Sequence, residues 1–542
     1  MALLNGCGGA GPAAATPPSA SASASASSAA DVLAAPRGVT LQPLNASESI
    51  LEWIGSSGDE TGFMVERRVA GGAWSVRAVT AANATWYRDG GLAADSGVEY
   101  RVSALRPSGS PVAVAAPALR MPSAAVQTIF YVDAALGADE GPGTEGRPWK
   151  TLQKAADTLR PGQTVLVRAG LYTGSAAAVL RIATSGAPGA WITYRAFPGE
   201  RPKIKTTIGQ NWNGIAITNA SYIVIDGFEI EGHVKQVDLA RALAEMRTPS
   251  AYSSGNAISL ENRDPAKPVA HHIVVRNNYM HDHGLGGFAA MGGDYLTVEN
   301  NRIYNVGATS SYGGSGISLL QPRPLDANMT DYKIIVRGNV SADNSNLVPC
   351  GCYAYQAPTD GNGIIFDLWK STAYTGRALV ANNIIFNNGG RGIHLFHGSP
   401  GAAIDVVFNT VLRNSTIEAT GEGKISLVDA HNVRVMNNIL VARADRPLNT
   451  SSPDSTNIVF RNNLLYGGNR FTGDAGANRR LADDQFAALF AAGSGLDGMR
   501  LGPASAAIDA ADNAALPLPE TDFLLAPRVQ GGAADIGAIE RQ

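Results

Sequence analysis

The chain has 542 residues, so we expect more than one domain, because a single hydrophobic core rarely extends so far. Its formal net charge of −3 gives no electrostatic case for nucleic-acid binding, which needs a clustered basic face. The sequence contains no apolar run of about 18 residues or more, the length typical of a membrane-spanning helix. Three cysteines are too few for a disulfide-rich scaffold.

The N-terminal 36 residues indicate location rather than chemistry. Leu4-Asn5-Gly6-Cys7 resembles a bacterial lipobox, and the residues that follow it are mainly Ala, Ser, Pro and Gly. Such a stretch has almost no apolar surface to bury and is predicted to be a disordered tether over residues 1–36. We therefore expect a secreted or cell-surface lipoprotein that contacts the membrane only through a lipid on Cys7. A chance cysteine in a low-complexity leader is the alternative.

Residues 37–122 have the pattern of a small β-sandwich. Strand-like segments alternate here with turns rich in Gly, Asp, Ser and Asn, and they lie at residues 50–53, 62–68, 74–79 and 99–105. Over its whole length the region resembles a fibronectin type III module, with Trp53 as the buried core ring and Tyr100 as the tyrosine near a strand corner. The resemblance implies that both residues are structural and that this module is a spacer without a catalytic role.

A short phrase recurs seven times between residues 275 and 463: an apolar residue, any residue, then usually Asn-Asn or Gly-Asn. Its closing asparagines lie 23, 38, 44, 26, 29 and 25 residues apart, and they are Asn278, Asn301, Asn339, Asn383, Asn409, Asn438 and Asn463. A period in the twenties with strand-like residues indicates a coiled β-solenoid. Each coil buries its apolar face only against its neighbours, and inward asparagines are expected to form a ladder. The two long intervals predict loops inserted into regular coils.

The main domain is expected over residues 127–542. It opens with a predicted strand, FYVD at 130–133, and a short amphipathic helix, PWKTLQKAADTL at 148–159, that would cover the open end of the solenoid. Together with the closing segments at 506–510 and 535–540, this opening resembles parallel β-helix polysaccharide-active proteins, particularly family 9 of the polysaccharide lyases, the pectate lyase-like group. The resemblance implies a right-handed parallel β-helix and suggests a lyase reaction.

A second repeated strand accompanies the asparagine phrase. Alternation of side chains along a strand places one set inside the coil: Ile258, Phe288, Ile317, Ile364, Ile393 and Ile425. The outward column is then Ser259, Ala289, Ser318, Ile365, His394 and Ser426. Beside it stands a column of glycines: Gly287, Gly316, Gly363 and Gly392. These glycines either form a flat exposed track for a glycan or serve bends between strands, and the sequence leaves both interpretations open.

The densest polar chemistry borders this strand. One coil carries Asp360, Asn362, Asp367 and Lys370, and the next carries Arg391, His394 and His397. Cleavage of a uronic acid by β-elimination removes the proton at C5 while a cation neutralises the adjacent carboxylate. In this interpretation Arg391 binds the carboxylate, and His394 or Lys370 is the base. His397 or His283 assists at the leaving oxygen.

The family resemblance adds a cofactor. Arg391-Gly392-Ile393-His394-Leu395 matches the strand that holds the family's catalytic lysine, with His394 at the lysine position. The family's calcium carboxylates match residues 361–365, where Asn362 alone keeps a ligating oxygen. Asp360 and Asp367 nearby supply further oxygens, so Ca²⁺ is a predicted ligand of these three residues. This departure makes pectate itself a less favoured substrate.

Aromatic residues of the inserted loops are candidates for stacking on sugar rings, and those that we assign to substrate binding are Tyr312, Trp369 and Tyr374. His283 joins them as a polar contact. In the same insertions Cys350 and Cys352 predict either a local disulfide or unpaired thiols.

Three functions remain open from the sequence. The first is a lyase that acts on an acidic polysaccharide. The second is a glycoside hydrolase that uses Asp360 and Asp367 as paired carboxylates. The third is a non-catalytic glycan-binding or adhesive solenoid. In each case we expect a monomer.

Overall fold

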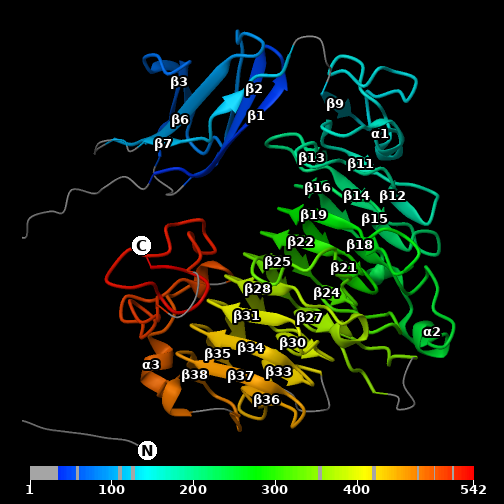
Figure 1. Cartoon of the computed structure of the whole chain (residues 1–542), viewed down its shortest axis with the longest axis vertical. Coiled ribbons are helices and arrows are strands. Elements are labelled where there is room, and N and C mark those ends of the chain that lie inside the picture. The colour runs from blue at the N-terminus through cyan, green and yellow to red at the C-terminus, as the bar shows by residue number, and fades with distance from the viewer. Residues whose placement is uncertain are drawn as a thin grey trace, which may run out of the picture.

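The chain is nearly all β, with small antiparallel sheets followed by long parallel ones (Figure 1). The computed structural model describes residues 35–55, 60–107, 111, 113–123, 128–351, 357–417, 423–472, 475–493, 495–514 and 518–541. The predicted fold class, a parallel β-helix preceded by a small sandwich, is confirmed. Cys7 and nearly all of the predicted tether lie outside the described residues. None of the helices within those ranges is long and apolar enough to cross a membrane.

The N-terminal sandwich packs two antiparallel sheets face to face. One contains β1 (Arg37–Asn45), β2 (Glu48–Ile54) and β5 (Trp86–Asp89); the other contains β3 (Gly62–Val69), β4 (Ser75–Ala81), β6 (Gly97–Leu105) and β7 (Ala113–Ala115), with β8 (Leu119–Arg120) beside β6. Trp53 and Tyr100 are buried in the core between them, as predicted. The Tyr100 hydroxyl donates a 2.6 Å hydrogen bond to Asp89, so the polar end of this buried side chain has a partner.

Three parallel sheets form the β-helix, and between its two ends the chain visits them in turn. Strands there pair with those three places away, whereas β9 pairs with β10 and β38 with β39 at the ends. Sheet I contains β9 (Ile129–Val132), β10 (Thr164–Val167), β13 (Ile192–Ala196), β16 (Ile223–Asp226), β19 (His271–Arg276), β22 (Asp294–Glu299), β25 (Tyr332–Arg337), β28 (Arg377–Ala381), β31 (Ala403–Val407), β34 (His431–Met436) and β37 (Thr456–Arg461). Sheet II contains β11 (Leu171–Tyr172), β14 (Lys203–Lys205), β17 (Glu229–Glu231), β20 (Tyr279–His281), β23 (Arg302–Tyr304), β26 (Val340–Ala342), β29 (Ile384–Phe386), β32 (Thr410–Leu412), β35 (Ile439–Val441), β38 (Leu464–Tyr466) and β39 (Arg479–Arg480). Sheet III contains β12 (Ala178–Ile182), β15 (Asn213–Thr218), β18 (Asn256–Glu261), β21 (Gly286–Met291), β24 (Ile317–Leu320), β27 (Ile364–Asp367), β30 (Ile393–Phe396), β33 (Ile425–Val428) and β36 (Asn449–Ser451).

Helices occur only as short pieces within the described ranges, and they are α1 (Leu152–Thr158), η1 (Val234–Gln236), α2 (Leu239–Ala244), η2 (Trp369–Thr372), η3 (Ala475–Ala477), α3 (Asp483–Ala487) and η4 (Asp497–Met499). The helix predicted near the start of the solenoid is α1. Its N-cap Thr151 accepts a hydrogen bond from the Lys154 backbone, and its buried face packs against β12, the first strand of sheet III.

The predicted asparagine ladder is present in the turn between sheets I and II. From Asn278 to Asn463, the side-chain NH₂ group of each asparagine donates to the side-chain Oδ1 atom of the next asparagine at 2.8–3.1 Å. The last bond of this series reaches Asn478, which lies beyond the seven phrases seen in the sequence. Each oxygen also accepts from the backbone N–H of the preceding asparagine. The ladder therefore satisfies buried amides that would otherwise cost about 1–3 kcal/mol each.

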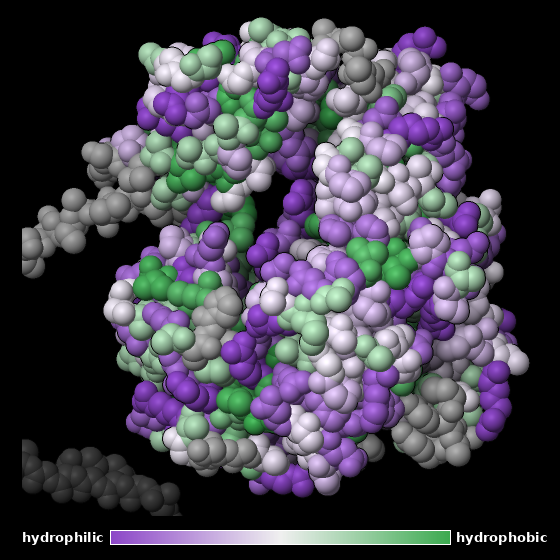
Figure 2. Space-filling view, in the orientation of Figure 1, coloured by the Kyte–Doolittle hydropathy of each residue, from purple (hydrophilic) through white to green (hydrophobic). Residues whose placement is uncertain are grey.

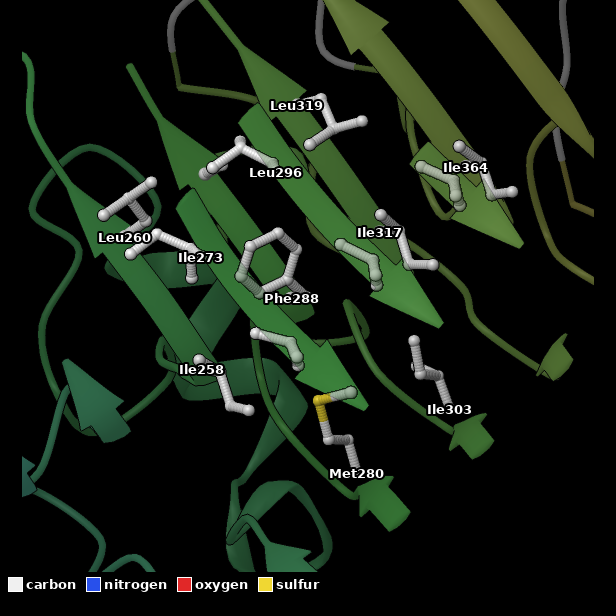
Figure 3. Packing of buried hydrophobic residues seen from close by; sticks show 14 of the residues in the cluster. Ile258, Leu260, Ile273, Met280, Phe288, Leu296, Ile303, Ile317, Leu319 and Ile364 are labelled. Carbon is white, nitrogen blue, oxygen red and sulfur yellow. The ribbon is translucent and has the colours of Figure 1, made fainter. Parts of the chain in front are cut away.

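The interior of the coils is apolar. Figure 3 shows Ile258, Phe288, Ile317 and Ile364 stacked from strand to strand, and the whole inward set predicted from alternation is buried. The glycine column also faces this interior, so its interpretation as a flat exposed track is wrong. A Cβ at Gly287 would lie 2.6 Å from the Ile303 side chain. Glycine is needed at these bends because no side chain fits between the strand and the core.

The C-terminal segment covers sheet II. Leu501, Ala507 and Ile536 pack on Ile439 and Val441 of β35. Further back along the sheet, Phe523, Ala538 and Ile539 pack on residues of β26 and β29. The outer face of sheet II is thus occupied by the chain itself over these strands, whereas sheet III keeps a half-exposed edge.

Candidate active site on sheet III

The outward residues of sheet III stand in register, as predicted. Ser259, Ala289, Ser318, Ile365, His394 and Ser426 are successive partners across β18, β21, β24, β27, β30 and β33. This outer column is nevertheless buried, with exposed fractions between 0% and 8%. His394 is 4% exposed, and its Nδ1 lies 3.3 Å from the Ser426 carbonyl, to which it donates.

The accessible part of the sheet is the next outward column, two residues further along each strand. It is half-exposed throughout, and it comprises Thr218, Glu261, Met291, Leu320, Asp367, Phe396 and Val428. We call it the edge column. Asp367 lies in it between Leu320 and Phe396 of the neighbouring strands. An acid on this edge is therefore flanked by apolar side chains about 4.8 Å away on either side.

The environment of Asp367 favours its protonated form. Burial and the nearby charge of Asp360 raise the pKa of Asp367 to about 7. Its Oδ1 has no hydrogen-bond partner among the described residues. The Nδ1 atom of His397, also without a hydrogen-bond partner in the described ranges, lies 3.8 Å from that oxygen. These two buried atoms lie slightly too far apart for a direct hydrogen bond.

Asp360 precedes β27 and differs from Asp367 in having donors. The Thr359 hydroxyl donates to its Oδ2 at 2.7 Å, and the Asn362 amide donates to its Oδ1 at 3.2 Å. Burial raises the pKa of Asp360, while these donors and the charge of Arg391 act in the opposite direction. Gly313 of the adjacent coil leaves the space for this carboxyl, because a Cβ there would lie 2.5 Å from its Oδ2.

Arg391 is held at the opposite end of β30 from His397. It is 6% exposed, its Nη1 donates to the Thr359 carbonyl, and its backbone N–H donates to the Asn362 side chain at 2.9 Å. The arginine thus supports the loop that carries Asp360, and it presents little surface to a substrate carboxylate.

Lys370 lies in η2, which follows the C-terminal end of β27, whereas Arg391 precedes the N-terminal end of β30. Its side chain is 57% exposed and forms a 2.9 Å ion pair with Asp429. The Lys370 backbone N–H donates to the His397 carbonyl at 3.0 Å, so these two predicted residues do lie together. Sequence reasoning missed Asp429 because it belongs to a later turn, and it missed Phe396, which the two-residue alternation from His394 would have revealed.

Three predicted substrate-binding residues are corrected by their burial. Trp369 is 1% exposed, and its indole N–H donates to the Leu319 carbonyl inside the coil. Tyr374 is fully buried and donates to Asp294 at 2.6 Å. His283 is 1% exposed, and burial lowers its pKa to about 3. None of the three reaches a substrate, because each fills space between the chain's own elements.

Tyr312 is the exception among the predicted aromatic residues. It is 56% exposed and lies 6.4 Å, ring centre to ring centre, from the half-buried Trp212. Because Tyr312 precedes Gly313, this aromatic pair borders the Asp360 carboxyl. Trp212 was not predicted, since it belongs to a coil far away along the chain.

Asn362, one of the predicted calcium ligands, already hydrogen-bonds to neighbouring protein groups. The Asn362 oxygen accepts the Arg391 backbone N–H, and its amide donates to Ser315 and Asp360. Among the described residues, the one group of three His, Cys, Asp or Glu side chains close enough to share an ion is Glu229, Glu231 and His281 on sheet II. Lys203 and Lys205 already neutralise those two glutamates. Calcium at sheet III stays a prediction from the resemblance.

The long insertion contains Cys350, whose sulfur is part of a disulfide. Cys7 and Cys352 lie outside the described residues.

The three parallel sheets and their stacked coils define a parallel β-helix domain. Residues 130–316 match the family model described as Pel9A-like, right handed beta helix region. The uncharacterized protein YwoF of Bacillus subtilis (strain 168) is 24% identical over 368 residues, which cover 61% of this chain and 69% of that protein.

Solved structures are similar to separate parts of the chain. The GH136 lacto-N-biosidase from Eubacterium ramulus has 14% sequence identity and a TM-score of 0.41, over 66% of this chain and 67% of that one. Domains A168–A170 from titin have 20% identity and a TM-score of 0.16, over 17% of this chain. The match spans 34% of the titin structure.

Proposed function

We propose that the protein hydrolyses glycosidic bonds on sheet III, with Asp367 as the general acid. The observation that carries this proposal is a half-exposed carboxyl with a pKa of about 7 and an unpartnered Oδ1 atom, next to His397. A general acid must hold its proton near neutral pH and must reach the leaving oxygen. Asp367 meets the first requirement through its burial and the nearby charge of Asp360.

Asp360 is the partner carboxylate in this mechanism. Burial raises the pKa of Asp360, and the donors Thr359 and Asn362 and the charge of Arg391 oppose that shift, whereas Asp367 receives only a backbone donor. Asp367 gives its proton to the glycosidic oxygen as the bond from that oxygen to C1 breaks, and one sugar leaves as an alcohol. Water supplies hydroxide to C1, and the remaining proton passes to Asp360.

The half-exposed aromatic and aliphatic side chains around the two acids suit the apolar faces of sugar rings. Phe396 follows Asp367 along the edge column, and its ring centre lies 3.8 Å from that of His397. Tyr312 and Trp212 lie on the Asp360 side. We infer that a glycan binds across neighbouring coils between these two aromatic groups.

A lyase is the second candidate, because Lys370, His397 and His394 do lie on adjacent coils. Against it, Arg391 is committed to the Thr359 carbonyl and Lys370 to Asp429. An acidic substrate and a calcium requirement are proposals that belong with this candidate and rest on the sequence. A location outside the cell and a lipid on Cys7 are proposals that apply to either candidate and also rest on the sequence.

Incubation with a panel of neutral and acidic polysaccharides separates the two reactions. New reducing ends without the ultraviolet absorbance of an unsaturated uronate indicate hydrolysis, whereas that absorbance indicates elimination. Asp367→Asn is expected to abolish product formation. Asp454→Asn, a conservative change at an exposed aspartate of a distant turn, is the matched control. Full activity in Asp367→Asn would reject the assignment.

A further inference from the structure

A cavity of about 420 Å³ lies between the N-terminal sandwich, sheet I and the C-terminal segment. Figure 2 shows the molecule hollowed at this junction. Its walls come from β1 and β2 of the sandwich, from the ends of β13, β16, β19 and β22, and from Leu525. Its volume falls within the range of small-molecule sites, about 300–1,000 Å³.

The sandwich is fixed in place beside this cavity. Leu44 and Ile50 of the sandwich pack with Tyr131, Leu166 and Phe197 of the β-helix in one buried cluster. Glu52 forms an ion pair with Arg195, and Arg88 forms another with Glu145. The cavity is therefore a built feature of the two domains together.

The wall on sheet I carries charges of alternating sign on successive strands. Arg195, Asp226, Arg276, Glu299 and Arg337 are register partners in that order. Arg276 donates to Asp226 at 2.9 Å, and Arg337 pairs with Glu299 at 2.8 Å. We call this row the charge ladder. Among the described residues, Arg195 is the only member of the charge ladder that forms an ion pair with the sandwich. The other members therefore do not hold the sandwich in place by ion pairs.

One buried donor beside the cavity has no partner within the described residues. It is Nη1 of Arg195, a residue with 8% exposure that lines the cavity from sheet I. Burial of a donor without an acceptor costs about 1–3 kcal/mol, so this atom favours a ligand that brings an acceptor.

We propose that this cavity binds a neutral sugar unit of mono- or disaccharide size by its hydroxyl groups. A hydroxyl both donates and accepts, so it can bond to a carboxylate and to an adjacent guanidinium of the charge ladder. An anion would meet the lining carboxylates Glu52, Asp226, Glu200 and Glu299, and a cation would meet Arg195, Arg201 and Arg276. The site is separate from the sheet III acids, and the proposal does not depend on which bond those acids cut.

The test uses the full chain with Asp367→Asn, so that no probe is turned over. Cellobiose, maltose and xylobiose are titrated by calorimetry, with digalacturonate as the acidic probe. We expect one neutral disaccharide to bind with a stoichiometry of one. Thr40→Trp, at an exposed position of β1 that lines the cavity, fills it without touching the charge ladder and should weaken binding by at least about tenfold.

Val79→Trp is the matched control, because Val79 is an exposed position of β4 in the other sheet of the sandwich. Gln42→Trp fills the same space from the next outward position of β1 and replaces Thr40→Trp if that variant does not fold. Unchanged affinity in the folded cavity-filling variant, binding of digalacturonate alone, or no heat from any probe would each overturn the proposal. Loss of catalysis in Asp367→Asn with retained binding would leave it intact.

Discussion

Asp367 and His397 face each other across 3.8 Å, from the carboxyl Oδ1 to the imidazole Nδ1, and neither atom has a hydrogen-bond partner among the described residues. One residue ends β27 and the other follows β30, so the pair exists only because two coils stack in register. Polar atoms in this condition are expected where a ligand completes the hydrogen bonding. Asp367, the acid of the mechanism proposed above, is one member of this pair.

Replacement of Asp367 by Asn should lower kcat on the cleaved glycan by about 10²- to 10⁴-fold, because the leaving oxygen loses its proton donor. The wild-type rate should also fall as pH rises through about 7, since the acid must be protonated to act. Initial rates across a pH series measure both effects. A rate that stays constant well above that pH would contradict the role of Asp367.

The same carboxyl should make the protein less stable at alkaline pH. Its pKa is raised in the folded state to about 7, so folding favours the protonated form. The contribution of Asp367 to the free energy of unfolding is fully present below its unfolded pKa of about 3.9. It is lost as pH rises through its folded pKa of about 7. Asp367→Asn should therefore melt at a higher temperature than the wild type near pH 8, and the difference should shrink near pH 4. Thermal unfolding at both pH values provides the comparison.

Lys370 distinguishes the two candidate reactions. If the protein hydrolyses its substrate, Lys370→Ala should retain most activity and lose less than about 1 kcal/mol of stability, because the ion pair with Asp429 is largely exposed. If the protein is a lyase with Lys370 as the base, the same variant should lose activity by several orders of magnitude. Activity and a denaturation curve on one preparation answer the question.

The asparagine ladder should be most sensitive in its middle. Asn339→Ala leaves the side-chain and backbone donors of Asn301 without an acceptor and should lower the free energy of unfolding by about 2–4 kcal/mol. Asn478→Ala, at the end of the ladder, should cost less because, among the described residues, Asn478 bonds to one other asparagine of the ladder rather than two. Equal denaturation midpoints for the two variants would show that the ladder does not act as a continuous network.

The inward orientation of the glycine column can be tested at Gly363. An alanine there would place its Cβ 2.7 Å from the Gly392 carbonyl oxygen and closer still to the Ile385 side chain. We expect Gly363→Ala to destabilise the fold by about 1–3 kcal/mol. Normal stability together with altered glycan binding in this variant would instead support the interpretation that the glycine column is an exposed surface for a glycan.

The sequence by itself determined the coil, because a strand repeat in the twenties and side-chain alternation depend only on spacing along the chain. It therefore predicted the inward isoleucines, the asparagine ladder and the register of the outer column, all of which are observed. It did not predict which outward residues are exposed. The left-handed backbone at Leu368 begins the turn whose Trp369 and Tyr374 pack inward beside Phe366, away from any substrate.

Only the tertiary structure decided the chemistry of the site. The pKa of Asp367 depends on its burial between stacked coils and on the nearby charge of Asp360. The interdomain cavity likewise requires the sandwich and the C-terminal segment to meet one wall of the solenoid. Burial and electrostatic coupling are properties of neighbours in space, and the lengths of the inserted loops that bring those neighbours together follow no periodic rule.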